Sequence, residues 1–228
     1  MNQYLVRNYL NIKKLYKRTL TMIKLNIGCG LSTCDGWINY DGSLKVKLQR
    51  LKIIGPFFNL LKPKFPKNVY YADVTTKIPR QSNSVDIIYS SHMLEHLSLE
   101  EFALALNEIY RLLKPGAIFR AVMPDLEYSI KVYLANTNSE ANYEFLKGID
   151  LGIEVKPKGI ISNISSLISN SKHLWIWDYK GLSDQLEKAG FTNIKRAFFN
   201  DSAIEDFKEV EDYKRWINCL GFECQKPS

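Results

Sequence analysis

Two glycines and two aspartates near the start of the chain have types and spacing that suit nucleoside binding. Gly28 and Gly30 interrupt an apolar run, and Asp41 and Asp73 fall at the ends of the next two strand-like segments. Glycine has no Cβ, so the backbone can turn sharply there and approach a ligand closely. In open α/β sheets ligands bind beyond the carboxyl ends of the strands, where aspartates can accept hydrogen bonds from ribose hydroxyls. Thr33 replaces the third glycine of a dinucleotide fingerprint, so the glycines alone do not decide the ligand.

The three histidines of the chain form a second group of candidates for chemistry. His92, Glu95 and His96 have the H-x-x-E-H spacing of inverted zinc peptidases, in which two histidines bind zinc and the glutamate activates water. Here the pattern directly follows a strand-like segment rather than lying in a long helix, so Glu95 and His96 could instead only fix a turn. His173 could be a general base for a hydroxyl acceptor, because the usual pKa of histidine is about 6.5, or could hold a loop in place.

Four cysteines, Cys29, Cys34, Cys219 and Cys224, are too few for a disulfide scaffold and indicate a reducing, cytoplasmic compartment. They form two C-x4-C pairs, but paired zinc ligands usually lie about two to four residues apart, and one pair lies in the glycine loop. We therefore interpret the cysteines as packing residues and predict no metal ligands.

Positive charge is concentrated at the N-terminal end. Residues 1–72 hold 13 lysines and arginines against two aspartates, while the whole chain has a formal net charge of +7. Apolar residues at three- and four-residue spacing predict a basic amphipathic helix over residues 1–22, and residues 44–67 form a basic insertion. These segments could dock on the sheet with a solvated lysine face, or could make peripheral contact with an anionic membrane or an acidic, lipid-linked substrate. A third possibility is a mitochondrial leader.

Two other interpretations of the basic end fit less well. Nucleic acid is an unlikely partner, because the aromatic residues lie on the apolar stripe rather than among the basic ones. No uncharged apolar run approaches the roughly 20 residues that a membrane span needs.

Short apolar segments alternating with helical patterns predict a mostly parallel sheet. The predicted strands are residues 23–27, 37–40, 68–72, 85–90, 117–123, 192–199 and 216–224. Ser98 and Glu101 form a capping box for a helix that should end at 114–116, and a second helix over 178–189 should stop at Gly190. Only ten residues separate Gly30 from Asp41, too few for a full crossover helix, so we expect a turn there, with residues 43–67 supplying helical cover.

Four motifs in fixed order give the most specific indication. They are LNIGCG (25–30), GWINYD (36–41), YSSHMLEH (89–96) and RLLKPG (111–116). As a set they resemble the class I S-adenosylmethionine (SAM) dependent methyltransferases, in a methyltransferase type 11-like subgroup, over about residues 23–226. The resemblance implies an α/β Rossmann-like three-layer sandwich, with a mostly parallel seven-stranded sheet and a C-terminal antiparallel hairpin. The methyltransferase domain would span 23–228, with 126–175 covering the substrate side.

The resemblance also implies S-adenosyl-L-methionine as the cofactor and assigns roles to residues. Asp41 would hold the ribose diol, and Asp73, before Val74, the adenine amino group. Asn26 stands where many relatives have an acidic residue. His92 would lie near the transferable methyl, and with His173 it is a candidate catalytic residue. The predicted cofactor-binding set is Asn26, Gly28, Cys29, Gly30, Asp41, Asp73, Val74, Ser90 and Ser91.

The reaction that the resemblance implies is in-line transfer of a methyl group to an oxygen or nitrogen of a small-molecule or saccharide acceptor. Sugars of surface polysaccharides are the leading candidates by the same resemblance. Transfer from a sulfonium needs little acid–base help, because the donor is already activated and alignment supplies much of the rate. The alternatives are a SAM-binding module without catalysis and the zinc peptidase above.

Overall fold

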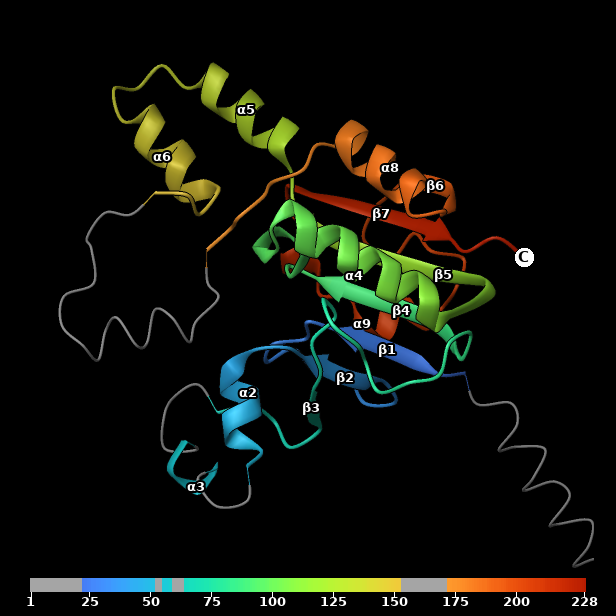
Figure 1. The fold of residues 1–228 in the computed structure, drawn as a ribbon. Coiled ribbons are helices and arrows are strands. Elements are labelled where there is room, and N and C mark those ends of the chain that lie inside the picture. The colour runs from blue at the N-terminus through green and yellow to red at the C-terminus, as the bar shows by residue number, and fades with distance from the viewer. Residues whose placement is uncertain (1–21, 52–54, 59–63, 153–171) are drawn as a thin grey trace, which may run out of the picture.

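A seven-stranded sheet forms the centre of the protein in a computed structural model, which describes residues 22–51, 55–58, 64–152 and 172–228 (Figure 1). The strand order is β3-β2-β1-β4-β5-β7-β6. Strands β1 to β5 run parallel, and β7 runs antiparallel to both β5 and β6. The predicted sheet and its antiparallel C-terminal pair are confirmed. The strands are β1 (Lys24–Ile27), β2 (Ile38–Asp41), β3 (Val69–Tyr71), β4 (Val85–Ser91), β5 (Leu113–Pro124), β6 (Thr192–Ala197) and β7 (Cys219–Gln225).

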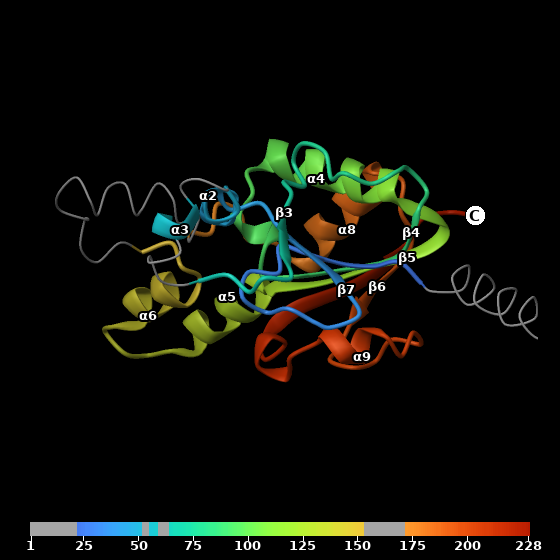
Figure 2. The same ribbon diagram turned by 90° about the horizontal axis from the view of Figure 1, so that it is seen from below.

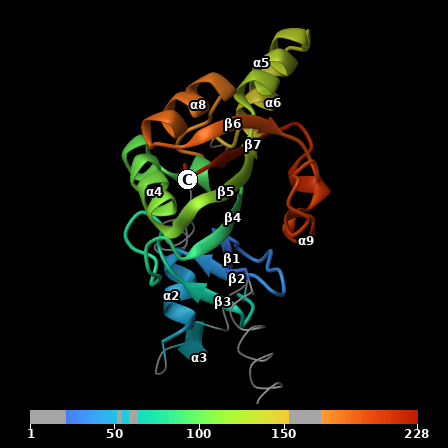
Figure 3. The same ribbon diagram turned by 90° about the vertical axis from the view of Figure 1, so that its right-hand side faces the viewer.

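Helical layers cover both faces of this sheet, as the predicted three-layer sandwich requires. Helices α4 and α8 pack on one face and the short α9 on the other (Figure 3). Phe102 of α4 and Leu182 of α8 are fully buried in the first layer, whereas Phe207 of α9 and Trp216 are buried in the second. The described helices are α2 (Leu44–Gln49), α3 (Gly55–Phe58), α4 (Leu99–Leu112), α5 (Leu126–Ala135), α6 (Ala141–Gly148), α8 (Tyr179–Lys188) and α9 (Phe207–Val210), with 3-10 turns η1 (Leu94–His96) and η2 (Tyr213–Arg215).

The predicted ends of α4 and α8 are confirmed except at one boundary. The Ser98–Glu101 capping box is present, and Asp178 caps α8 by accepting the N–H of Gly181. However, α4 ends at Leu112 and β5 starts at the next residue, so the prediction that residues 114–116 end the helix and that a strand starts at 117 was wrong. Residues 114–116 lie inside β5, where the pairing with β4 slips, and such a bulge tolerates a proline that has no N–H to donate.

The connection from β1 to β2 contains no helix, as its ten-residue length predicted. Helix α2 lies in the predicted basic insertion and packs beside β3, where Val46 and Val69 are buried together with Cys29. Figure 2 shows α2, α3, α5 and α6 gathered beyond the carboxyl ends of the parallel strands. The chain therefore places its extra helices around the edge where ligands bind in such sheets.

Part of each predicted flanking segment lies outside the described residues. This holds for residues 1–21 of the predicted N-terminal helix, for 52–54 and 59–63 of the basic insertion, and for 153–171 of the predicted substrate-side cover. Within the described ranges, no helix is long and apolar enough to cross a bilayer.

A fully buried arginine joins β5 to the segment that carries α9. Arg120 forms ion pairs with Asp201, Glu211 and Glu223, and its guanidinium lies 4.7 Å from the centre of the Trp216 ring. Burial lowers the pKa of Arg120, but its hydrogen bonds and charge interactions with Glu211 and Asp201 outweigh that and raise it. A buried charge needs such partners, so residues 198–218 are fixed to the sheet.

We expect Gly190→Ala to destabilise the fold, because Gly190 follows α8 at φ +91° and an added Cβ would lie 3.3 Å from the Tyr110 ring. The left-handed conformation alone costs an L-residue roughly 1–2 kcal/mol. The matched control is Gly148→Ala, since Gly148 ends α6 without a positive φ and with no atom within 4 Å of the added carbon. Urea unfolding midpoints measure both variants, and equal midpoints would contradict the expectation.

Candidate active site

The glycine loop after β1 is fixed to the end of β2 by one carboxylate. Asp41 is 8 % exposed; its Oδ2 accepts the N–H of Gly30 at 2.9 Å, and its Oδ1 accepts the N–H of Ser43 at 2.9 Å. The N–H of Cys29 donates to the carbonyl of Tyr40. Two loop amides are thus used within the protein, and Asp41 lies at the strand end where the sequence predicted it.

The two glycines of the loop are required for different reasons. Both have left-handed φ, +67° at Gly28 and +54° at Gly30. A Cβ on Gly28 would lie 2.2 Å from Cγ of Met93, whereas a Cβ on Gly30 would meet no atom within 4 Å. Gly28 therefore allows Met93 to pack against the loop, and Gly30 leaves open space beside it.

Cys29, between the glycines, is buried. Burial, and then the charge of Asp41, raise the pKa of its thiol to about 12, so it is an uncharged packing residue at neutral pH.

Asn26 is held by hydrogen bonds inside the loop. Its amide nitrogen donates to the carbonyl of Ser32 at 3.0 Å and to Oδ1 of Asn39 at 3.1 Å. Asn39 in turn accepts the N–H of Cys34 and donates to the carbonyls of Cys34 and Trp37. These contacts fix the shape of the connection between β1 and β2.

The aspartates at the ends of β2 and β3 lie at adjoining backbones. The N–H of Ala72 donates to the carbonyl of Asp41, and a Cβ on Gly42 would lie 3.2 Å from Cα of Asp73. Oδ1 of Asp73 accepts both the N–H and the hydroxyl of Thr75, in a turn that orients the side chain. Val74 beside it is buried.

The two serines that end β4 have opposite environments. Ser90 is 1 % exposed and pairs in register with Ile27, directly before the glycine loop; its hydroxyl has no hydrogen-bond partner among the described residues. The hydroxyl of Ser91 accepts Nε of Arg215 at 2.7 Å, and its carbonyl accepts another guanidinium nitrogen. Ser90 is therefore the serine with unused hydrogen-bonding capacity.

His92 has φ +50°, and each of its ring nitrogens lies close to an oxygen atom. Nε2 lies 2.9 Å from the carbonyl of Arg215, and Nδ1 lies 3.3 Å from Oε1 of Glu95. Burial lowers the pKa of His92, but its interactions with Cys219, the Glu95 carboxylate and the Arg215 carbonyl outweigh the effect of burial and raise the pKa to about 10. The imidazole is therefore protonated at neutral pH and is a poor proton acceptor.

His173 lies close to the other two histidines, around Glu95. Its Nδ1 donates to the carbonyl of Ile149 at 2.8 Å, and its Nε2 lies 3.9 Å from Oε1 of Glu95. The rings of His96 and His173 are 5.1 Å apart. The two imidazole rings in contact are thus those of His96 and His173, rather than those of His92 and His96 in the H-x-x-E-H pattern.

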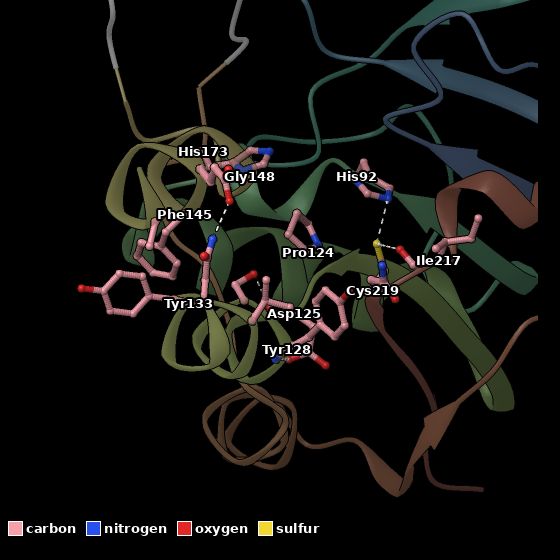
Figure 4. Close-up of a pocket in the computed structure, with 16 residues that line it drawn as sticks. His92, Pro124, Asp125, Tyr128, Tyr133, Phe145, Gly148, His173, Ile217 and Cys219 are labelled. Carbon is pink, nitrogen blue, oxygen red and sulfur yellow. Dashed lines mark hydrogen bonds between the residues drawn. The ribbon is translucent and has the colours of Figure 1, made fainter. Parts of the chain in front are cut away.

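A cavity of about 400 Å³ opens beside the carboxyl ends of β4 and β5 (Figure 4). His92 and His173 lie along one rim, and Cys219 lies beside His92. Most of the wall comes from α5, α6 and the start of β7, which carry none of the glycine-loop motifs. Its lining residues include Pro124, Asp125, Tyr128, Ser129, Tyr133, Asn136, Glu144, Phe145, Gly148 and Ile217. Sequence reasoning named the segment 126–175 but missed residues 217–219 and Arg215.

Comparison with known proteins gives one family model that matches part of the chain. Residues 25–121 match the model of the methyltransferase domain family. This range contains the glycine loop, both aspartates, the two serines and the H-x-x-E-H segment. No curated protein matches the chain by sequence.

Several solved methyltransferase structures align with most of this chain at low sequence identity. A SAM-dependent methyltransferase from Methanosarcina mazei is 17% identical, with 90% of this chain and 92% of that chain covered and a TM-score of 0.48. A SAM-dependent methyltransferase from Archaeoglobus fulgidus is 17% identical, with 99% of this chain and 95% of that chain covered and a TM-score of 0.46. Phosphoethanolamine N-methyltransferase 2 of Haemonchus contortus, in complex with S-adenosyl-L-methionine, is 16% identical. The alignment covers 91% of this chain and 49% of that chain, with a TM-score of 0.48.

The strand order of the sheet reverses between β1 and β4, the position at which open α/β sheets bind ligands. The strand order and the matched family model agree. The chain therefore carries the methyltransferase domain that its residues 25–121 match, with S-adenosyl-L-methionine as the cofactor.

Proposed function

We propose that this methyltransferase acts on an oxygen or nitrogen of a small-molecule or saccharide acceptor, held in the cavity between α5, α6 and the end of β4. The observation that carries the proposal is the position of the cavity. His92 follows β4 directly and also lines the cavity. The acceptor would therefore lie next to the carboxyl end of β4, beside the residues that would bind the methyl donor.

The residues at that edge fit the cofactor. S-Adenosylmethionine, when bound, supplies a methyl group on a positively charged sulfur. Asp41 would accept the ribose hydroxyls, because a carboxylate has about four acceptor sites and two are used by backbone amides. Asp73, next to Val74, would accept the adenine amino group. The open space at Gly30 and the unused hydroxyl of Ser90 suit the methionine part.

Other residues of the predicted set would act by shaping this edge. Asn26 holds the loop, Gly28 admits Met93, Cys29 packs beneath the loop, and Ser91 fixes Arg215. They would place the binding groups without binding the cofactor themselves.

The cavity wall suits a hydroxylated acceptor of modest size. Tyr128, Tyr133 and Phe145 offer aromatic surface, while Asn136 and Glu144 add polar groups and are joined by a hydrogen bond. Mixed aromatic and polar walls and a volume near 400 Å³ are typical of small-molecule sites. Sugars of surface polysaccharides remain our leading candidates, and contact of residues 1–67 with a membrane surface remains a prediction.

The two candidate catalytic histidines would have different roles. Protonated His92 would position the end of β4 against η2 and Glu95. Nε2 of His173 is the ring nitrogen left to take an acceptor proton, since its Nδ1 is bound to a carbonyl. Alignment of the acceptor with the donor would supply much of the rate. A SAM-binding module without catalysis would bind the cofactor and release no product, and turnover assays distinguish the two.

Asp41→Asn should weaken binding of S-adenosylhomocysteine at least about tenfold, because hydrogen bonds to a charged group contribute roughly 1.5–3 kcal/mol. Isothermal titration calorimetry measures the dissociation constant. Asp35→Asn is the matched control, since Asp35 is an exposed aspartate of the same loop. If both variants bind like the unsubstituted chain, Asp41 does not hold the cofactor.

Ser90→Ala should raise the stability of the ligand-free protein by about 1 kcal/mol, because it removes a buried hydroxyl that has no hydrogen-bond partner in the described part of the chain. The same change should weaken SAM binding several-fold if that hydroxyl serves the ligand. Ser91→Ala is the paired comparison and should instead destabilise the fold, because it removes a partner of Arg215. Urea unfolding and calorimetry report the two effects, and a loss of stability in Ser90→Ala would refute the first.

Gly148→Phe should block acceptor turnover and leave cofactor binding intact, because Gly148 lines the cavity and has open space where a side chain would start. Release of S-adenosylhomocysteine with a panel of sugars and small hydroxylated compounds measures turnover. Gly148→Ala serves as the small-side-chain control. Full turnover by Gly148→Phe would show that the acceptor binds elsewhere.

A further inference from the structure

All three histidines of the chain converge on one carboxylate, and they come from two separate segments. His92 and His96 flank Glu95 after β4, while His173 precedes α8. Nδ1 of His92 lies 3.3 Å from Oε1 of Glu95, and Nε2 of His173 lies 3.9 Å from the same oxygen. One ligand atom from each of Glu95, His96 and His173 lies within 4.8 Å of the other two.

The buried carboxylate of Glu95 accepts no hydrogen bond from the residues that the structure describes. It is 1 % exposed, and neither carboxylate oxygen has a hydrogen-bond partner within the described part of the chain. Its backbone is nevertheless held firmly, since its carbonyl accepts the N–H groups of Leu174 and Trp175. A buried carboxylate is costly unless it is paired or coordinates a metal, and here Oε2 is left without a partner.

The two nearby imidazoles are held as metal ligands usually are. Nδ1 of His96 donates to the carbonyl of Lys172 at 2.9 Å, and Nδ1 of His173 donates to the carbonyl of Ile149 at 2.8 Å. A carbonyl can only accept, so Nδ1 carries the proton and Nε2 of a neutral ring carries the lone pair. Histidine ligands of metals commonly donate their other N–H to a carbonyl in this manner.

We propose that Glu95, His96 and His173 bind a divalent first-row transition metal ion. Two imidazoles and a carboxylate suit zinc and its neighbours, and three protein ligands leave coordination positions open. Ligands about 2.1 Å from one tetrahedral ion lie about 3.4 Å apart, so the side chains would move inward by roughly 1 Å. This site differs from a peptidase site, because Glu95 is a ligand and His92 is not.

The position of the ion suggests an effect on the acceptor. His173 also lines the cavity, so an open coordination position would lie beside the acceptor and favour a hydroxyl oxygen as the methylated atom. Coordination lowers the pKa of a hydroxyl. With the ion bound, Nε2 of His173 is a ligand and no longer a base, so the hydroxyl proton would leave to water. The oxygen forms the bond to the methyl carbon as the carbon–sulfur bond breaks, with the electrons of that bond remaining on sulfur. This role rests on the proposed function, whereas metal binding does not.

Cobalt(II) titration of the untagged, full-length, EDTA-treated protein tests the site, because tetrahedral Co²⁺ gives visible absorption. We expect one ion per chain. Glu95→Gln and His173→Gln should each weaken binding about 100-fold or more, since even changes in outer-shell partners cost about 10- to 100-fold. Thermal unfolding of each variant without metal shows that it is folded.

Cys219→Ser is the control, because Cys219 lies 3.7 Å from His92 and a thiolate is the competing ligand. It should retain the cobalt spectrum. Absence of cobalt uptake, or equal uptake by folded Glu95→Gln, would overturn the proposal. A SAM titration on the same EDTA-treated protein separates the two claims: loss of cobalt uptake with intact SAM binding counts against the metal site alone, and intact cobalt uptake without SAM binding counts against the proposed function alone.

Discussion

Both carboxylate oxygens of Asp41 accept hydrogen bonds from backbone amides, and the edge of the sheet at which we propose that the cofactor binds depends on these two bonds. One oxygen holds the glycine loop through Gly30, and the other holds Ser43, whose hydroxyl accepts the N–H of Val46 and so caps α2. Because the connection from β1 to β2 is too short for a helix, no helix N-terminus organises the loop. A carboxylate does so instead, and it is the same group that we propose accepts the ribose hydroxyls.

Local patterns were enough to predict most of the fold. Apolar segments located the strands, and the capping box at Ser98 and the glycine at 190 located helix ends, because both signals act within one or two turns. The start of β5 was missed because it depends on a distant partner: the N–H of Gly116 donates to the carbonyl of Lys226 at the end of the chain. The burial of Arg120 was missed for the same reason, since its acidic partners lie about 80 to 100 residues further along.

In the candidate site too, features that depend on local sequence could be predicted and contacts between distant residues could not. Asp41, Asp73, Ser90 and the glycine loop could be placed from the sequence, because the carboxyl ends of neighbouring parallel strands meet at one edge. The contact of Arg215 with Ser91 spans 124 residues and carries no local signal. The unused hydroxyl of Ser90 also has no signal in the sequence, because it results from the absence of a hydrogen-bond partner among the residues that the structure describes.

The H-x-x-E-H segment shows how local geometry decides what a motif does. On an α-helix, residues four apart share one face, so His92 and His96 would meet. Here His92 lies before η1 at φ +50°, and its Nε2 donates a hydrogen bond to the carbonyl of Arg215 in η2, which precedes β7. His96 instead faces His173, and the Glu95 carbonyl holds the backbone after His173. Glu95 therefore links His92 at the end of β4 to His173 in the cavity wall, so a change in the charge of Glu95 would affect both histidines.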